Sequence, residues 1–116
     1  MIICLPTDEG NIDSLLSEKL EKAKYLIFVE ESGVVNKCIS LRKKDDILFS
    51  ITGNKAEVVI TGNLSAENFD FLRASGIKVY AGVFGITARE ALGRFKRGEL
   101  REPKEEVSGV IKGRIV

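Results

Sequence analysis

The sequence contains no histidine, no tryptophan and no glutamine among its 116 residues. Without histidine, the chain lacks the base that most often activates a serine or cysteine nucleophile, and it lacks the commonest metal ligand. Ser–His and Cys–His catalysis are therefore excluded. The absence of glutamine beside 30% charged residues is a pattern typical of thermophilic proteins.

Cysteine is also scarce, since Cys4 and Cys38 are the only two. Two isolated cysteines on predicted strands have neither the spacing of a zinc site nor the number of a secreted disulfide framework. Free cysteine most often behaves as a small buried hydrophobic residue. We therefore predict that both side chains are buried.

Long apolar runs and an excess of charge are missing as well. No stretch is long enough to span a membrane, the first residues do not form a signal peptide, and the formal net charge is only +1. The basic run at residues 42–44 is followed at once by two acids, which is typical of a solvated turn. We expect a cytoplasmic protein, monomeric or weakly homo-oligomeric, with neither nucleic acid nor membrane as its partner.

The first part of the chain predicts a strand, a short helix and a hairpin. Residues 2–5 form an apolar run that Pro6 stops. Residues 11–24 carry apolar side chains at near-helical spacing, with Glu18 and Lys22 as a favourable i,i+4 pair. The runs at 25–30 and 34–41 are rich in β-branched residues and surround a Ser-Gly turn, which predicts an antiparallel pair.

A second helix is predicted at residues 47–53. Asp45 or Asp46 would cap it, and Gly53 would end it. The apolar run at 47–49 would also suit a strand.

The stretch at residues 57–65 is the centre of the predicted sheet. It is a continuous apolar strand followed by a Gly62-Asn63 turn and by Ser65, which can cap the next helix. A strand follows at 77–81, and Thr87 then opens a capping box for a last helix.

Alternating strands and helices predict an α/β fold with a mostly parallel sheet and helices on both faces. The sheet would have five strands and be mixed, with one antiparallel strand and with residues 58–60 parallel to 2–5 and 77–80. Leu92, in the middle of the last helix's apolar stripe, should be buried. Residues 1–100 form one domain, and 101–116 form a charged tail that is mobile or, alternatively, docks on the body or a partner.

Three loops follow the carboxyl ends of the predicted parallel strands, where open α/β sheets bind ligands. They are residues 7–11, 61–65 and 82–87. Two of them lead into helix N-termini, which would offer free N–H groups and positive dipole ends to an anion. The alternative is that these are ordinary connecting turns.

Enzyme interpretations find little support in these loops. Asp8, Glu9 and Asp13 lie near the first strand, but a two-metal nuclease needs several converging carboxylates. The later strand ends offer no acid. There is no P-loop, and residues 82–85 are not a dinucleotide-binding fingerprint. We therefore predict that the protein is not an enzyme.

Five segments match a family pattern, at residues 2–6, 23–29, 56–63, 75–80 and 91–100. In them the chain resembles the nitrogenase iron–molybdenum cofactor biosynthesis family, the NifX-like dinitrogenase cofactor-binding domain. The resemblance covers roughly residues 1–100. It implies a ribonuclease H-like three-layer α/β/α fold, and a small non-catalytic carrier that binds iron–sulfur or iron–molybdenum cofactor precursors and passes them on, with cofactor-assembly proteins as partners.

Together, the loops and the resemblance predict a cofactor-binding site. Many family members carry Ser-x-His-Phe-Gly-Arg-Ala where this chain has residues 17–23, so that Lys19 stands in place of His. A protonated lysine has no lone pair for iron. The predicted cofactor-binding residues are Thr7, Asp8, Lys19, Thr61, Gly62, Asn63, Gly85 and Thr87.

The soft ligands for a metallocluster are limited to the two cysteines, whereas iron–sulfur clusters are often held by four. Both lie on predicted strands away from the loops, so we predict that neither is a ligand there. A cluster would then rest on backbone N–H groups near Gly62, Asn63 and Gly85, or would need a second chain. The alternative function is a regulatory or protein-interaction module that binds no metallocluster.

Overall fold

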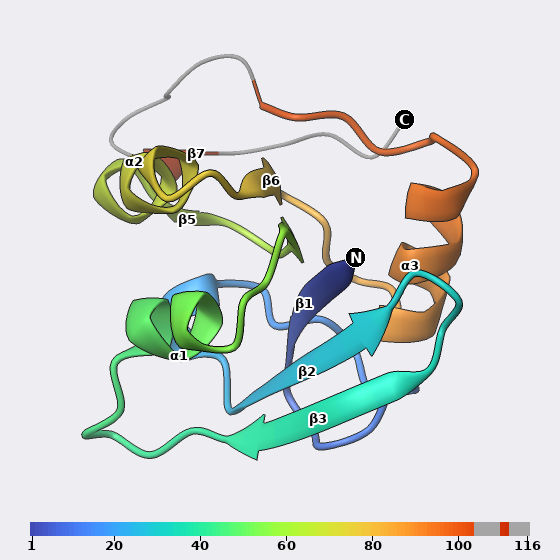
Figure 1. Ribbon diagram of the computed structural model, residues 1–116, viewed down its shortest axis with the longest axis horizontal. Helices are drawn as coiled ribbons and strands as arrows, with labels where there is room; N and C mark the ends of the chain where they lie inside the picture. Colours follow the sequence, from blue (N-terminus) through green and yellow to red (C-terminus); the bar gives the residue numbers. More distant parts are fainter. Residues whose placement is uncertain (104–109, 112–116) are drawn as a thin grey trace.

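A five-stranded sheet forms the centre of the computed structural model, which describes residues 1–103 and 110–111 (Figure 1). Its strands follow the order β3-β2-β1-β4-β6. β1, β4 and β6 run parallel, whereas β2 pairs antiparallel with both β1 and β3. The α/β class and the mixed sheet are thus confirmed, and β4 lies between the parallel strands β1 and β6 as predicted, although the middle strand of the five is β1. The bounds are β1 (Ile2–Thr7), β2 (Tyr25–Glu30), β3 (Val35–Ser40), β4 (Val58–Ile60) and β6 (Lys78–Tyr80).

Among the described residues, each of the three α-helices begins at a side-chain cap that the sequence predicted. They are α1 (Ile47–Gly53), α2 (Ala66–Ala74) and α3 (Ala88–Lys96). The Asp46 carboxylate accepts from two backbone N–H groups at the start of α1, and the Ser65 and Thr87 hydroxyls accept from Asn68 and Glu90. Each cap satisfies donors that would otherwise lack partners, which explains why residues 47–49 form a helix and not a strand.

The helices bury the two faces of the sheet in separate cores. α1 and α2 pack on one face, and α3 packs on the other. Figure 1 shows α1 and α2 on one side of the strands and α3 on the opposite side. Leu92 on α3 is only 4% exposed and lies in the same core as Ile3, Val58 and Ile60, so its predicted burial is confirmed.

Of the short helix or helical turn predicted at residues 11–24, only one 3₁₀ turn is present, η1 (Leu20–Lys22), and no α-helix forms. Leu16 packs in the core beneath α3, and Leu20 packs in the core beneath α1 and α2. In an α-helix, residues four apart share a face, so no helix could place these two on opposite sides of the sheet. The predicted i,i+4 pair of Glu18 and Lys22 is lost with the helix.

The sequence predicted that the first strand stops at Pro6, but β1 continues to Thr7. The carbonyls of Ile2 and Pro6 face away from β2, because they accept from the N–H groups of Glu57 and Ser17. The backbone nitrogen of Pro6, which carries no hydrogen, therefore faces the side of β1 where pairing with β4 has already ended at Cys4. Proline is tolerated here because no ladder bond is lost.

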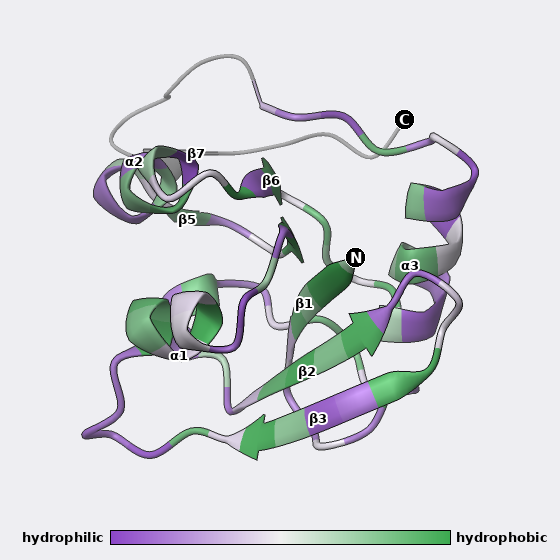
Figure 2. Cartoon of the chain, in the orientation of Figure 1, coloured by the Kyte–Doolittle hydropathy of each residue, from purple (hydrophilic) through white to green (hydrophobic). Residues whose placement is uncertain are grey.

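The predicted burial of Cys38 is wrong, whereas that of Cys4 is confirmed. β3 is the edge strand, and five of its six residues are exposed. Figure 2 shows the difference, since β1 and β2 are largely hydrophobic and β3 has a hydrophilic stretch between hydrophobic residues. An edge strand beyond the reach of α3 leaves its side chains in solvent.

A second, two-stranded ladder joins β5 (Leu64–Ser65) to β7 (Val110–Ile111) in antiparallel pairing. The sequence did not predict it. The tail predicted at residues 101–116 falls largely at 104–109 and 112–116, which lie outside the described residues. Within the described part of the chain, no helix has the length and hydrophobicity needed to cross a membrane.

Candidate functional site at the carboxyl ends of the strands

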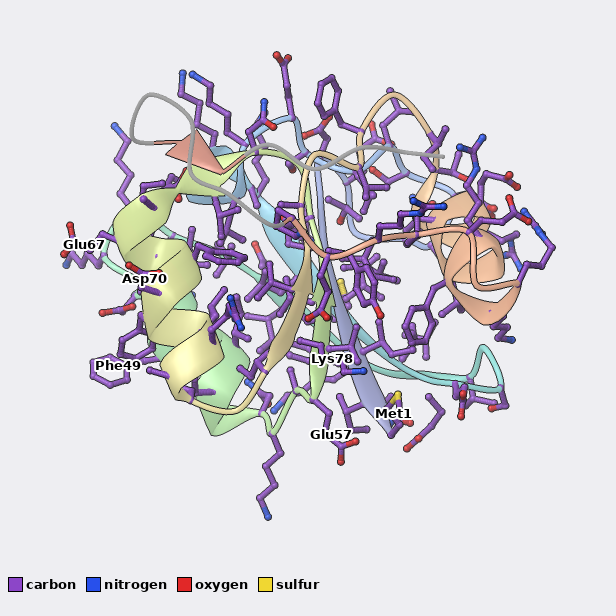
Figure 3. The ribbon with its side chains drawn as sticks, turned by 90° about the horizontal axis from the view of Figure 1, so that it is seen from above. Met1, Phe49, Glu57, Glu67, Asp70 and Lys78 are labelled. Carbon is purple, nitrogen blue, oxygen red and sulfur yellow. The ribbon has the colours of Figure 1, made fainter. Side chains whose placement is uncertain are left out.

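The three predicted loops meet at one end of the sheet. Because β1, β4 and β6 are parallel, their carboxyl ends lie on the same side. Figure 3 shows the opposite end, where Met1, Glu57 and Lys78 lie together at the starts of these strands. The loops after β1, β4 and β6 therefore surround a common edge, as the strand order predicted.

Residues 12–19, which we call the crossing segment, connect these loops through their backbone. Leu16 N–H donates to the Ile86 carbonyl at 3.1 Å. On the other side, Asn63 N–H donates to the Glu18 carbonyl at 2.8 Å, and Leu20 N–H donates to the Asn63 carbonyl at 2.8 Å. The segment thus passes from the loop before α3 to the loop after β4, across the end of the sheet.

A pocket of about 380 Å³ opens beside the crossing segment. The Ser17 hydroxyl donates to Asp8 Oδ1 at 2.9 Å and holds that carboxylate in place. Two ammonium groups and two carboxylates face the pocket, so it offers charged hydrogen-bond donors without a strong net charge. It is lined by Asp8, Ser17, Glu18, Lys19 and Lys22.

Four of the predicted site residues lie at or against this pocket. Asp8 and Lys19 line it directly. Gly62 and Asn63 support it, because the crossing segment lies on their backbone. A Cβ atom on Gly62 would stand 2.3 Å from the carbonyl oxygens of both Ser17 and Glu18, so no residue with a side chain fits there.

Thr7 is the last residue of β1 and Thr61 directly follows β4, but both are fully buried and neither lines the pocket. The Thr7 hydroxyl donates to the Glu9 carbonyl at 2.6 Å. Thr61 Oγ1 has no hydrogen-bond partner among the described residues. A buried hydroxyl left without a partner costs about 1–3 kcal/mol, so Thr61 is an unsatisfied position directly behind the site.

Gly85 and Thr87 lie on the other side of the crossing segment, before α3. Gly85 has φ +80°, a backbone conformation that favours glycine. The predicted free N–H groups of this helix are not free. Ala88 N–H donates to the Ser14 carbonyl at 2.9 Å, and Arg89 N–H donates to the Ile12 carbonyl at 2.8 Å.

The N-terminus of α2 is occupied as well, in this case by a carboxylate of the chain. Glu21 Oε2 accepts from Ser65 N–H at 3.2 Å and from Asn68 Nδ2 at 2.7 Å. A negative charge is stabilised at this position by the helix dipole. The alternative of an ordinary connecting turn therefore holds before α3, whose first N–H groups bond to the crossing segment, whereas at α2 the Glu21 carboxylate already places a negative charge beside the helix start.

Ser17 and Lys22 are pocket residues that the sequence did not indicate. The signal that could have indicated them was their closeness in sequence to Lys19, which was a predicted site residue. The helix predicted at 11–24 concealed it, since it would place Lys19 and Lys22 on a regular exposed face and remote from Asp8.

The thiols do not contribute to this pocket. Cys4 is fully buried within β1, and burial raises the pKa of its thiol. Cys38 lies on β3 near Gly10, and partial burial also raises its thiol pKa. In the described part of the chain, no three His, Cys, Asp or Glu residues gather in a way that could hold a metal ion.

A larger hollow of about 480 Å³ lies beside Tyr80, the last residue of β6. It is open, and its wall ends at Pro103, where the described residues are interrupted. The pocket of about 380 Å³, which we call the strand-end pocket, is the better candidate site, because the loop after β1 and the crossing segment line it together. The hollow is lined by Phe69, Arg73, Tyr80, Leu100, Arg101, Glu102 and Pro103.

The fold and the pocket together define a small open α/β domain with its candidate ligand site beyond the carboxyl ends of the parallel strands. Residues 1–98 match the family described as dinitrogenase iron-molybdenum cofactor, and the chain belongs to that family. No match was found among curated proteins.

Solved structures share this fold. A NifB candidate from Thermotoga is 26% identical with a TM-score of 0.77, and the match covers 93% of this chain and 98% of that one. The apo form of the orange protein from Desulfovibrio gigas is 21% identical, with a TM-score of 0.76 and 94% of each chain covered. A dinitrogenase candidate from Methanocaldococcus jannaschii is 22% identical with a TM-score of 0.69, covering 94% and 96%.

Proposed function

We propose that this protein is a non-catalytic carrier that binds a precursor of a metal–sulfur cofactor, such as that of dinitrogenase, in the strand-end pocket. Membership of the iron-molybdenum cofactor family supports the cargo class. The observation that carries the site is the convergence of Lys19 and Lys22 on one pocket that is backed by the crossing segment.

The residues present fit an anionic cargo held by charge, and they do not fit a cluster ligated by side chains. Neither thiol reaches the pocket, and the chain has no histidine. Lysine ammonium groups bind anions as compact point charges with three donors each. A precursor bound in this way would be exchanged readily, which suits a carrier that hands its cargo to cofactor-assembly proteins.

The order of the strands also supports the finer fold assignment. Three parallel strands, a hairpin at one edge and helices on both faces are what a ribonuclease H-like three-layer domain requires. In nucleases of such layered folds the strand ends present several carboxylates to metal ions. Here the ends of β4 and β6 present Thr61 and Ala81, which supports binding without catalysis.

A second candidate function is a regulatory or protein-interaction module that binds no metallocluster. It is favoured because no three His, Cys, Asp or Glu residues cluster around a possible metal position among the described residues. The balanced charge of the pocket favours it as well. The two candidates differ in one measurable property, which is the uptake of metal.

The test is anaerobic reconstitution of the full chain with iron(II), sulfide and molybdate, followed by desalting, metal analysis and absorption spectroscopy. We expect retained metal and a visible charge-transfer band. A Lys19→Ala, Lys22→Ala variant should bind at least about tenfold more weakly, because charged hydrogen bonds contribute about 1.5–3 kcal/mol each. A Lys43→Ala, Lys44→Ala variant changes the net charge equally, outside the pocket, and should bind like the parent chain.

Two further results are decisive. If a Cys4→Ala, Cys38→Ala variant loses metal uptake, the thiols are ligands and the proposed site is wrong. If the unaltered chain takes up no metal, the carrier function fails and the interaction module replaces it.

A further inference from the structure

Glu21 joins η1 to the start of α2 through a single carboxylate oxygen. It is the middle residue of η1, and its side chain is exposed. Its Oε2 accepts from Ser65 N–H at 3.2 Å and from Asn68 Nδ2 at 2.7 Å. These donors lie 44 and 47 residues further along the chain. The contact therefore holds a short turn against a helix from a distant part of the sequence.

η1 is a turn that depends on attachments of this kind. It is three residues long, and Lys19, which precedes it, makes no capping hydrogen bond with its side chain. A single 3₁₀ turn has weak internal hydrogen bonds and little stability of its own. The Leu20 N–H donates to the Asn63 carbonyl at 2.8 Å, which fixes the start of the turn. Glu21 is its attachment to α2.

The same turn carries the two ammonium groups of the strand-end pocket. Lys19 directly precedes η1, Lys22 ends it, and both line the pocket. A Glu21 carboxylate that left α2 would compete with an anion for these two neighbours, because opposite charges attract. In the described part of the chain, none of the ion pairs involves Glu21, Lys19 or Lys22. Its attachment to α2 thus keeps the carboxylate from neutralising the donors of the pocket.

We propose that Glu21 is a positioning residue of the strand-end pocket, because its carboxylate at the start of α2 fixes η1 and leaves Lys19 and Lys22 available to an anion. The inference rests on the proposed function, since it concerns how the pocket holds an anionic cargo. The helix dipole and the charged hydrogen bonds both favour a carboxylate at the start of α2. An ion pair with a solvent-exposed lysine gains little by comparison.

Two substitutions of Glu21 separate its position from its charge. Glu21→Gln and Glu21→Ala remove the same negative charge. Both hydrogen bonds end on one oxygen, and an amide oxygen has two lone pairs, so glutamine can keep the contact whereas alanine cannot. If charge alone mattered, both variants would bind an anion equally well, and more tightly than the parent chain.

The probe is molybdate, a dianion, and equilibrium dialysis against the full-length chain measures its affinity. We expect Glu21→Gln to bind molybdate at least as tightly as the parent chain. Glu21→Ala should bind it at least about threefold more weakly than Glu21→Gln, because the lysines are no longer fixed. Equal affinities of these two variants would overturn the proposal.

Asn68→Ala tests the contact from its other side, since it removes a donor to Glu21 without changing the net charge. It should weaken molybdate binding, and it should add nothing to Glu21→Ala, because both substitutions break one contact. Glu67→Ala is the control. It removes a negative charge from the same turn of α2, and Figure 3 shows the Glu67 side chain directed away from the body of the molecule. The control should not weaken binding, and additive effects of Glu21→Ala and Asn68→Ala would contradict the proposal.

Amide hydrogen exchange distinguishes a failure of this inference from a failure of the proposed function, because it needs no cargo. The N–H groups of Lys22 and Ala23, which bond within η1, should exchange at least about threefold faster in Glu21→Ala than in Glu21→Gln. Equal exchange rates in the two variants refute the positioning role. If the unaltered chain binds no molybdate while the exchange rates differ as expected, the proposed function fails and the attachment of η1 by Glu21 stands.

Discussion

Gly62 is the residue on which the geometry of the pocket depends most directly. Its position between β4 and the crossing segment leaves no room for a side chain, since an added Cβ would approach two carbonyl oxygens to 2.3 Å. The contact is with backbone and not with a flexible side chain, so relief requires the segment itself to move. A glycine at this point is thus a steric requirement of the site.

Gly62→Ala should destabilise the fold by about 1–3 kcal/mol, the usual cost of overpacking. Urea unfolding measures this, and Gly53→Ala is the control because no atom lies within 4 Å of a Cβ added there. The control should change stability by less than about 1 kcal/mol. Equal effects of the two substitutions would show that the crossing segment shifts to accommodate the added Cβ at little cost in stability.

At the scale of elements, the crossing segment is secured to α3 by an ion pair as well as by its backbone. Arg89 Nε donates to Asp13 Oδ1 at 2.8 Å. The hydrogen bond from Arg89, followed by its positive charge, lowers the pKa of Asp13 below its ordinary value. A carboxyl whose pKa is lower in the folded state adds stability above its unfolded pKa and loses that contribution as pH falls through the folded pKa.

We therefore expect Asp13→Asn to be less stable than the parent chain at neutral pH and to converge with it as the pH falls through the lowered folded-state pKa of Asp13. Urea unfolding at a series of pH values measures the difference. Arg89→Gln should give the same profile, and the double variant should add nothing. A constant difference at all pH values would mean that packing, and not the ion pair, is responsible.

The elements themselves were predictable where pattern and cap agree. β4 is a continuous apolar run that has a strand on each side, and Ser65 and Thr87 are capping residues directly before apolar stripes. The crossing segment was not predictable, because apolar residues four apart fit a helix as well as a chain that places Leu16 and Leu20 in different cores. For the same reason Lys19 and Asp8 were indicated one by one, while their meeting with Ser17 and Lys22 was not.

At the scale of the whole molecule, the two thiols differ in their access to solvent, so their reaction with a reagent reports on different states of the fold. Cys4 lies fully buried in β1, between strands on both sides, whereas Cys38 is exposed on the edge strand. Reaction of a thiol with a reagent requires access as well as ionisation. Cys4 should consequently become available only when the central sheet opens.

In a thiol-labelling experiment followed by mass spectrometry, we expect Cys38 to react at once in native buffer. Cys4 should react at least roughly 10³-fold more slowly than Cys38, because opening of a core strand requires most of the free energy of unfolding. Urea should accelerate labelling of Cys4 and leave that of Cys38 nearly unchanged. Similar native rates for the two thiols would contradict the placement of β1 at the centre of the fold.

The crossing segment has a consequence for how such a protein can change over evolutionary time. Its attachments to the loops after β4 and before α3 are made by backbone atoms, and Leu16 within it and Leu20 just after it are buried in the two cores. The side chains of Glu18 and Lys19, by contrast, are exposed and free to vary. Substitution at these two positions would alter what the pocket recognises without loosening the scaffold. The architecture thus separates heritable change in specificity from the stability on which folding depends.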